Sequence, residues 1–251
     1  VAAGIPGGVW LFQEVTGHEL TEDKLHEGSM ATARLYYAQE SIQELMKSDP
    51  IPLSAVDHDI CSWLSVSATK RAVEEGEEAF AILRKELEQR VKEGKGGKEV
   101  PGKGAPRVTF VDPPTTDPGV LQVMQGAGLA PVVDMIGYPV SKKRVERRFK
   151  ARPEHFAEIQ LRRGSYDGSW GYVNQLMELC TNFNIDGVIH LYHYACRSMN
   201  ISPIMVKNMI EKQLNIPVLP LEWDIYDTRN YNGETLRTRI ETFAEMLKAS
   251  K

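Results

Sequence analysis

Hydrophobic positions in the first third of the chain return at helical spacing. Apolar and small residues recur every three or four positions from Thr21 to the sequence SDPIP at residues 48–52, which predicts one long helix. Thr21 is a favourable N-cap, and the acids Glu22 and Asp23 suit the positive end of the helix dipole. Two further helices are predicted, one around residues 60–64 and one from residue 73 to about residue 91. We therefore expect this part of the chain to be helical.

The pattern changes after residue 106. Four short apolar runs bounded by turn residues are typical of buried strands, at residues 107–113, 130–137, 186–194 and 216–224. Helical stretches lie between and after them, around residues 120–127, 170–183, 204–214 and 234–247. Strands that alternate with helices require right-handed crossovers. The expected fold class is therefore α/β, with a four-strand parallel sheet that carries helices on both faces.

Residues 93–106 separate the two patterns. This stretch, EGKGGKEVPGKGAP, is rich in Gly, Lys and Pro and offers almost nothing to bury, so a solvated linker or loop is expected. The predicted organisation is a helical segment at residues 1–92, a linker at residues 93–106 and an α/β domain at residues 107–251.

Composition excludes several classes of protein. The 251 residues carry a formal net charge of −4, which argues against nucleic acid as a partner. No apolar run approaches the roughly 18 residues that span a bilayer, and the N-terminal residues do not resemble a signal peptide. Neither a Walker A motif nor GxGxxG is present, so ATP and dinucleotides are not expected to bind. The 3 cysteines are far apart, which indicates a reducing, cytoplasmic environment rather than a disulfide framework.

The loops that follow the strands are where a parallel sheet binds its ligands. These are the segments at residues 112–116, 135–138, 193–198 and 222–227. Cys196 lies in the third of them and is followed by Arg197 and Ser198, a setting that favours the thiolate form of a cysteine. On the residues alone, Cys196 is a cluster ligand, a nucleophile or an inert core thiol.

Four other polar residues accompany the last two strands. His190 lies within its strand and is expected to face the core, whereas His193 lies nearer the strand end and is the better candidate for proton transfer. Glu222 and Asp224 are spaced to face one side at a strand end. They are candidates for a general base or for binding a cofactor hydroxyl, and the alternative is that they cap a turn or pair with Arg229, Arg237 or Arg239.

Several segments, in order, resemble one known family. They are TGHELTEDKL (16–25), DPIPLS (49–54), RVTFVDPPTTDP (107–118), DGVIHLYHYAC (186–196) and the last run from residue 215 to residue 247, which ends in RTRIETFAEML. Together these motifs resemble the subunits of 2-hydroxyacyl-CoA dehydratases and benzoyl-CoA reductases. The match is to the C-terminal portion of a subunit. The chain also starts with Val1 rather than Met, so we expect a processed, split or partial chain.

The resemblance implies a flavodoxin-like fold and a defined chemistry. In this family two homologous subunits pair and hold a [4Fe–4S] cluster through three cysteines. A separate ATP-hydrolysing activator delivers one electron, which turns a CoA thioester into a ketyl radical before dehydration or reduction. The expected partners are thus a sister subunit, the activator and an acyl-CoA. The basic stretch at residues 142–152 is either a site for the phosphates of coenzyme A or a solvated helix face.

Roles are predicted for single residues, and the one of Cys196 is implied by the resemblance. Cys196 matches a cluster-ligating cysteine, so it is the expected cofactor and metal ligand. Arg197 and Ser198 are the predicted substrate-binding residues, and His193 and Glu222 the predicted catalytic ones. The other two cysteines of this chain, Cys61 and Cys180, match no ligand position and are expected in the core.

One cysteine alone cannot retain a [4Fe–4S] cluster. The other two ligands of the family lie in a domain upstream of the segment that begins at Thr16. Either another chain or segment supplies them, which makes this an enzyme subunit, or the protein is a cluster-free, non-catalytic partner or accessory subunit of the same fold.

Overall fold

The computed structural model describes residues 4–64, 70–111, 118–134, 168–193, 203–224, 229 and 232–250. The four predicted strands are confirmed. They are β1 (Arg107–Val111), β2 (Ala130–Asp134), β3 (Gly187–His193) and β4 (Val218–Trp223). They form one parallel sheet with the order β2-β1-β3-β4. Every residue of β1 and β2 is buried, because helices cover both faces of a sheet of this kind.

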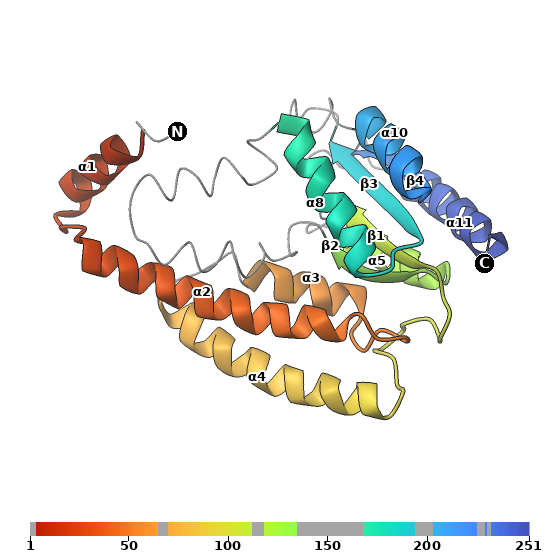
Figure 1. Ribbon diagram of the computed structural model, residues 1–251, viewed down its shortest axis with the longest axis horizontal. Coiled ribbons are helices and arrows are strands. Elements are labelled where there is room, and N and C mark those ends of the chain that lie inside the picture. Colours follow the sequence, from red (N-terminus) through yellow and green to blue (C-terminus); the bar gives the residue numbers. More distant parts are fainter. Residues whose placement is uncertain are drawn as a thin grey trace.

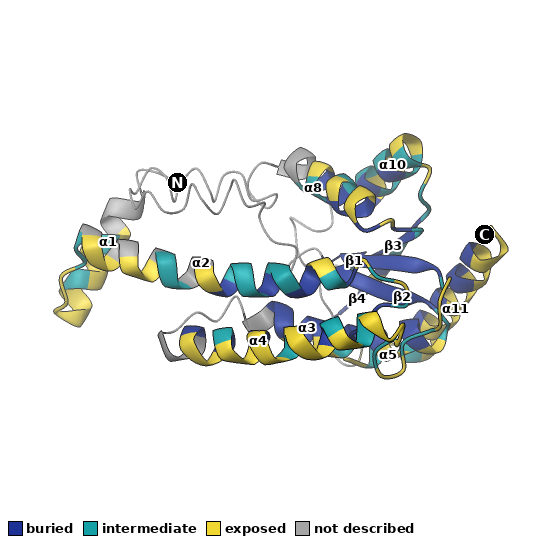
Figure 2. Ribbon diagram, turned by 60° about the horizontal axis from the view of Figure 1, so that its bottom comes forward, coloured by how far each residue is buried: buried dark blue, intermediate teal, exposed yellow. Residues whose placement is uncertain are grey.

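Helices on the two faces of the sheet enclose two hydrophobic cores. Helices α5 (Pro118–Gly126) and α11 (Gly233–Ala249) pack on one face, against Phe110 and Leu191 among others. Helices α8 (Gly168–Asn182) and α10 (Pro203–Leu214) pack on the opposite face, against residues such as Val188 and Val218 (Figure 2). The predicted α/β fold with a doubly covered parallel sheet is confirmed.

The strand order places a topological switch point between β1 and β3. The chain leaves β1 toward β2 on one side and leaves β3 toward β4 on the other. Connections that diverge in this way open a crevice at the carboxyl ends of the two central strands. A ligand is therefore expected beyond Val111 and His193, the last residues of β1 and β3.

The first part of the chain is helical, as predicted. It contains α1 (Gly4–Thr16), α2 (Glu22–Leu45), α3 (Ala55–Leu64) and α4 (Lys70–Lys92). The predicted N-cap at Thr21 is confirmed, because its hydroxyl accepts a hydrogen bond of 3.3 Å from the backbone N–H of Lys24. Helices α2 and α4 lie side by side (Figure 1) and approach closely, since a Cβ at Gly76 would lie 2.8 Å from Leu35 Cδ1.

Helix α1 was not predicted from the sequence. It stands at the far end of α2 from the sheet (Figure 1), and its large side chains Trp10, Leu11, Phe12 and Val15 are exposed. Glycine and proline, which disfavour a helix interior, make up four of its first five residues.

One buried arginine joins the helical part to the sheet. Arg107, the first residue of β1, donates from its guanidinium to the carbonyls of Met46 (2.9 Å), Ser48 (3.0 Å) and Phe183 (3.0 Å). These carbonyls lie just beyond the C-terminal ends of α2 and α8, where helix geometry leaves acceptors unsatisfied. The cation also suits the negative ends of the two helix dipoles.

Residues 93–106 are mostly exposed but are not free of the rest of the chain. The N–H of Gly97 donates to the carbonyl of Ile51 (3.0 Å), and the N–H of Gly104 donates to the carboxylate of Asp49 (3.0 Å). The segment is thus fixed at two points to the stretch between α2 and α3. The division into domains on either side of it stays a prediction.

Candidate site at the carboxyl edge of the sheet

The described polar residues at the carboxyl edge of the sheet come from three strand ends. Asp134 ends β2, His193 ends β3 and Asp224 follows β4. Cys196, Arg197 and Ser198 lie outside the described residues, as does the basic stretch at residues 142–152. Their predicted roles therefore stay predictions.

His193 lies beside the end of the neighbouring strand β4. Parallel pairing places it opposite Trp223, the last residue of that strand. Its Nδ1 is 3.3 Å from the carbonyl oxygen of Trp223 and 3.8 Å from Oδ1 of Asp224. Both His193 and Asp224 are buried, at 8% and 6% exposure, so the carboxylate acts on the ring with little screening by water. A histidine next to a buried carboxylate is suited to accepting and returning a proton.

Glu222 and Asp224 have different surroundings although they were predicted to face one side. Glu222 is exposed and is hydrogen-bonded to Tyr192, its partner across the β3–β4 pair. Burial, followed by the charge of Glu222, raises the pKa of the Tyr192 hydroxyl. Asp224 is instead buried beside His193, so these two carboxylates do not make one paired site.

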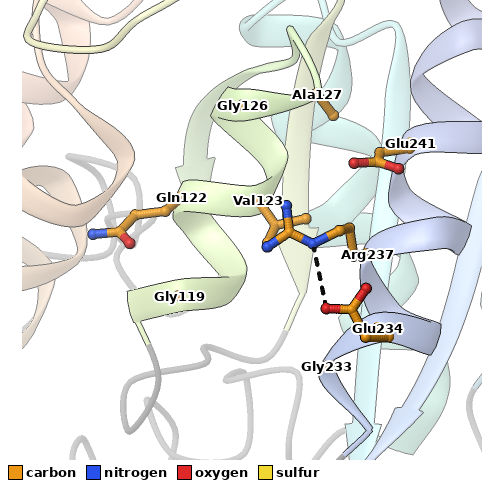
Figure 3. Close-up of a pocket in the computed structure, with 9 residues that line it drawn as sticks. All are labelled: Gly119, Gln122, Val123, Gly126, Ala127, Gly233, Glu234, Arg237 and Glu241. Carbon is orange, nitrogen blue, oxygen red and sulfur yellow. Dashed lines mark ion pairs between the residues drawn. The ribbon is translucent and has the colours of Figure 1, made fainter.

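The arginines of α11 serve different purposes. Arg239 donates to the carbonyl of Pro220 (2.8 Å) and so ties α11 to β4. Arg237 forms an ion pair of 4.0 Å with Glu234 and lines a groove of about 450 Å³ between α5 and α11 (Figure 3). Glu241 lines the same groove, so the two acids outweigh the single cation there. The groove is therefore a poor match for the phosphates of coenzyme A.

A second cluster of buried polar residues, which was not predicted from the sequence, links α3 to the end of β2. Ser62 donates to Asp134 Oδ2 at 2.8 Å, and His58 Nδ1 lies 3.6 Å from the same oxygen. Burial lowers the pKa of His58, while the charge of Asp134 opposes that change. The available signal was the four-residue spacing of His58 and Ser62, which places both on one face of a helix.

His190 is fully buried in the middle of β3, as expected for a residue facing the core. Neither of its ring nitrogens has a hydrogen-bond partner, and its neighbours are the rings of Tyr172 and Tyr192 at centroid distances of 6.3 and 6.2 Å. Burial lowers its pKa to about 4. His190 is therefore a neutral core residue at ordinary pH, and His193 is the histidine of β3 that can serve the site.

Cys61 and Cys180 are both free thiols in the core, as predicted. Burial raises the pKa of Cys180 to about 12, and burial together with Asp57 raises that of Cys61 to about 11. Both side chains pack in the hydrophobic core, which fits the structural role expected for them. Among the described residues, no three His, Cys, Asp or Glu side chains gather closely enough to hold a metal ion.

These features define a doubly wound α/β protein whose polar groups gather at the carboxyl edge, where such folds bind ligands. The family model for the 2-hydroxyglutaryl-CoA dehydratase D-component matches residues 11–247, and the chain belongs to this family. In the described residues, no helix has both the length and the apolar character needed to cross a membrane.

Three characterised relatives match almost the whole chain. It is 24% identical to the alpha subunit of (R)-2-hydroxyglutaryl-CoA dehydratase from Acidaminococcus fermentans, over 95% of this chain and 48% of that protein. It is 23% identical to the (R)-phenyllactyl-CoA dehydratase alpha subunit from Clostridium sporogenes, over 95% of this chain and 57% of the relative. It is 22% identical to a benzoyl-CoA reductase subunit from Thauera aromatica, with 94% of this chain and 56% of the relative covered. The chain thus spans about half the length of these relatives.

Proposed function

We propose that this chain is part of an iron–sulfur enzyme that dehydrates or reduces acyl-CoA thioesters by one-electron chemistry. The observation that carries the proposal is that β3 ends with His193 at the switch point of the sheet, and Cys196 follows three residues later in the sequence. The relatives support the proposal, because two of them are named as subunits of acyl-CoA dehydratases and one as a subunit of benzoyl-CoA reductase.

Cys196 is the proposed ligand that this chain gives to a [4Fe–4S] cluster. Because Cys61 and Cys180 are buried thiols, the remaining ligands come from outside the segments described here. When bound, such a cluster supplies a single electron to the thioester carbonyl, which makes a neighbouring C–H group more acidic. We propose that an ATP-hydrolysing activator delivers that electron, and that a homologous sister subunit completes the cytoplasmic enzyme.

The chain's own residues would bind the substrate and move its protons. His193 and Glu222 are the proposed proton-transfer residues, and Arg197 and Ser198 the proposed substrate-binding residues. His193 is the better supported of the first two, because it is buried at a strand end with a carboxylate 3.8 Å from its ring nitrogen.

A second candidate function is a cluster-free partner or accessory subunit. It is favoured by the number of cysteines, since only one of the 3 in this chain is suited to ligation. Such a protein would keep the fold and the surface for pairing but would bind no iron.

Iron and acid-labile sulfide analysis of the anaerobically purified protein, together with any co-purifying subunit, separates the two candidates. About four iron atoms per assembly are expected for a [4Fe–4S] enzyme. Cys196→Ala should remove the iron and the brown chromophore while the fold is kept. Cys61→Ala, the matched control, should leave both unchanged. Iron that persists in the Cys196 variant contradicts the ligand assignment, and no iron after anaerobic reconstitution supports the accessory subunit.

A further inference from the structure

The ring of His193 presents its Nδ1 to two oxygen atoms that can only accept hydrogen bonds. The carbonyl oxygen of Trp223 is at 3.3 Å and Oδ1 of Asp224 is at 3.8 Å. A carbonyl and an ionised carboxylate both lack a proton to donate. If Nδ1 carried a lone pair, that pair would face two negative oxygens in a buried place where repulsion is weakly screened. The proton of the neutral ring therefore belongs on Nδ1.

We infer that the Trp223 carbonyl and the Asp224 carboxylate hold His193 in the Nδ1–H tautomer, so that Nε2 is the atom that exchanges protons at this site. Asp224 is then a positioning residue, which acts through the histidine rather than on the substrate. This arrangement follows the logic of histidine–carboxylate pairs in other enzymes, where the carboxylate orients the ring and balances its charge.

The proton transfer that this geometry permits is balanced at each atom. The lone pair of Nε2 takes a proton from a hydroxyl or a C–H group next to a thioester, and the ring becomes an imidazolium. The proton on Nδ1 stays directed at the Trp223 carbonyl, and Asp224 supplies the opposite charge. The same proton is later returned from Nε2 to the departing oxygen or to carbon. The nature of the substrate in this step rests on the proposed function, whereas the tautomer does not.

The fold itself fixes this pair of residues. Parallel hydrogen bonding places His193 opposite Trp223, so the end of β4 cannot slide away from the ring without breaking the ladder. On the other side of β4, Arg239 holds the Pro220 carbonyl and so ties the strand to α11. A ring held in this way is pre-organised for proton transfer.

The tautomer can be measured without any knowledge of the reaction. Long-range proton–nitrogen correlation spectra of the intact protein labelled with 15N at its 6 histidines would show it, with the signals of His193 assigned from His193→Gln. We expect a protonated Nδ1 and an unprotonated Nε2 in the neutral ring. A neutral ring with its proton on Nε2 overturns the inference, and the tautomer itself is read from the unmodified protein.

The role of Asp224 is measured in the assembled enzyme. Asp224→Asn should lower kcat at least tenfold and leave KM nearly unchanged, because the asparagine cannot balance an imidazolium. Glu245→Gln removes an exposed carboxylate on α11 and should keep the wild-type kcat. A wild-type kcat in Asp224→Asn overturns the positioning role. An unmodified assembly that is inactive on every CoA thioester contradicts the proposed function instead, and the tautomer measurement still decides the inference.

Discussion

His190 shows how one side chain links burial to pH. It is completely buried on a central strand and neither ring nitrogen has a hydrogen-bond partner. A histidine in that position is tolerated only while it is neutral, since a charged ring without a partner is costly to bury. This is the reason why its pKa falls to about 4. Burial also lowers the pKa of His58, so protonation of His58 should likewise destabilise the folded protein in acid.

The protein should therefore lose stability in mild acid. Because the pKa of His190 is lower when folded (about 4) than in the unfolded chain (6.5), the unfolded chain binds the proton first as the pH falls. The loss begins near pH 6.5 and reaches about 3 kcal/mol near pH 4, at about 1.4 kcal/mol per pKa unit. His190→Met should be the more stable protein at pH 5 in urea titrations and should have the shallower pH dependence.

The control for this prediction is His18→Gln, because His18 is exposed. That variant should keep the pH dependence of the wild type. Equal slopes for His190→Met and the wild type between pH 4 and 6.5 would show that His190 does not carry the effect.

At the scale of elements, helix ends decide how the layers fit together. Helices α2 and α8 belong to different parts of the chain, yet both end at the guanidinium of Arg107 on β1. Three carbonyls share this one buried cation, and the backbone N–H of Arg107 also binds the carboxylate of Asp186 at 2.7 Å. The helical part and the sheet therefore share one polar junction.

Arg107→Met should destabilise the fold by about 3 kcal/mol, because it leaves three carbonyls without their charged donor. Arg84→Met is the matched control, since Arg84 is exposed and pairs with Glu88 within one helix at 2.8 Å. Such pairs contribute only about 0.3–0.5 kcal/mol. Free energies of unfolding from urea titrations measure both variants. Similar small losses for the two would mean that the carbonyls find other partners.

At the scale of the whole molecule, residues 93–106 are held against the turn that precedes α3. Gly97 lies so close to this turn that a Cβ there would be 2.7 Å from the carbonyl carbon of Leu53, whereas a Cβ at Gly102 would meet nothing within 4 Å. The segment is therefore tightly packed at Gly97 and open around Gly102.

Gly97→Ala and Gly102→Ala test this attachment directly. The first should destabilise the protein by about 1–3 kcal/mol, because the new methyl group meets backbone that cannot rotate away. The second should change stability by less than about 0.5 kcal/mol. Thermal and urea unfolding measure both. If Gly97→Ala is as harmless as Gly102→Ala, the segment behaves as the solvated linker that its composition suggests.

Much of the fold could be predicted because it depends on local patterns. Runs such as residues 186–194 are mostly apolar, as buried parallel strands are, and Thr21 begins a helix through contacts within one turn. Helix α1 could not be predicted, since Gly4, Pro6, Gly7 and Gly8 all disfavour a helix interior. The contact of Gly97 with the turn before α3 could not be predicted either, because a glycine-rich sequence has the same composition whether the segment is packed or solvated.

The sequence by itself determined the class of fold and the loops in which to look for a site, because alternation of strands and helices fixes where parallel strands end. Only the tertiary structure decided which polar groups meet. The sequence offered Asp224 no histidine partner, and the register of β3 and β4 places it beside His193. Likewise, α3 brings His58 to Asp134 from a distant part of the chain. Such pairs depend on register and burial between remote segments, and no local pattern of residues encodes them.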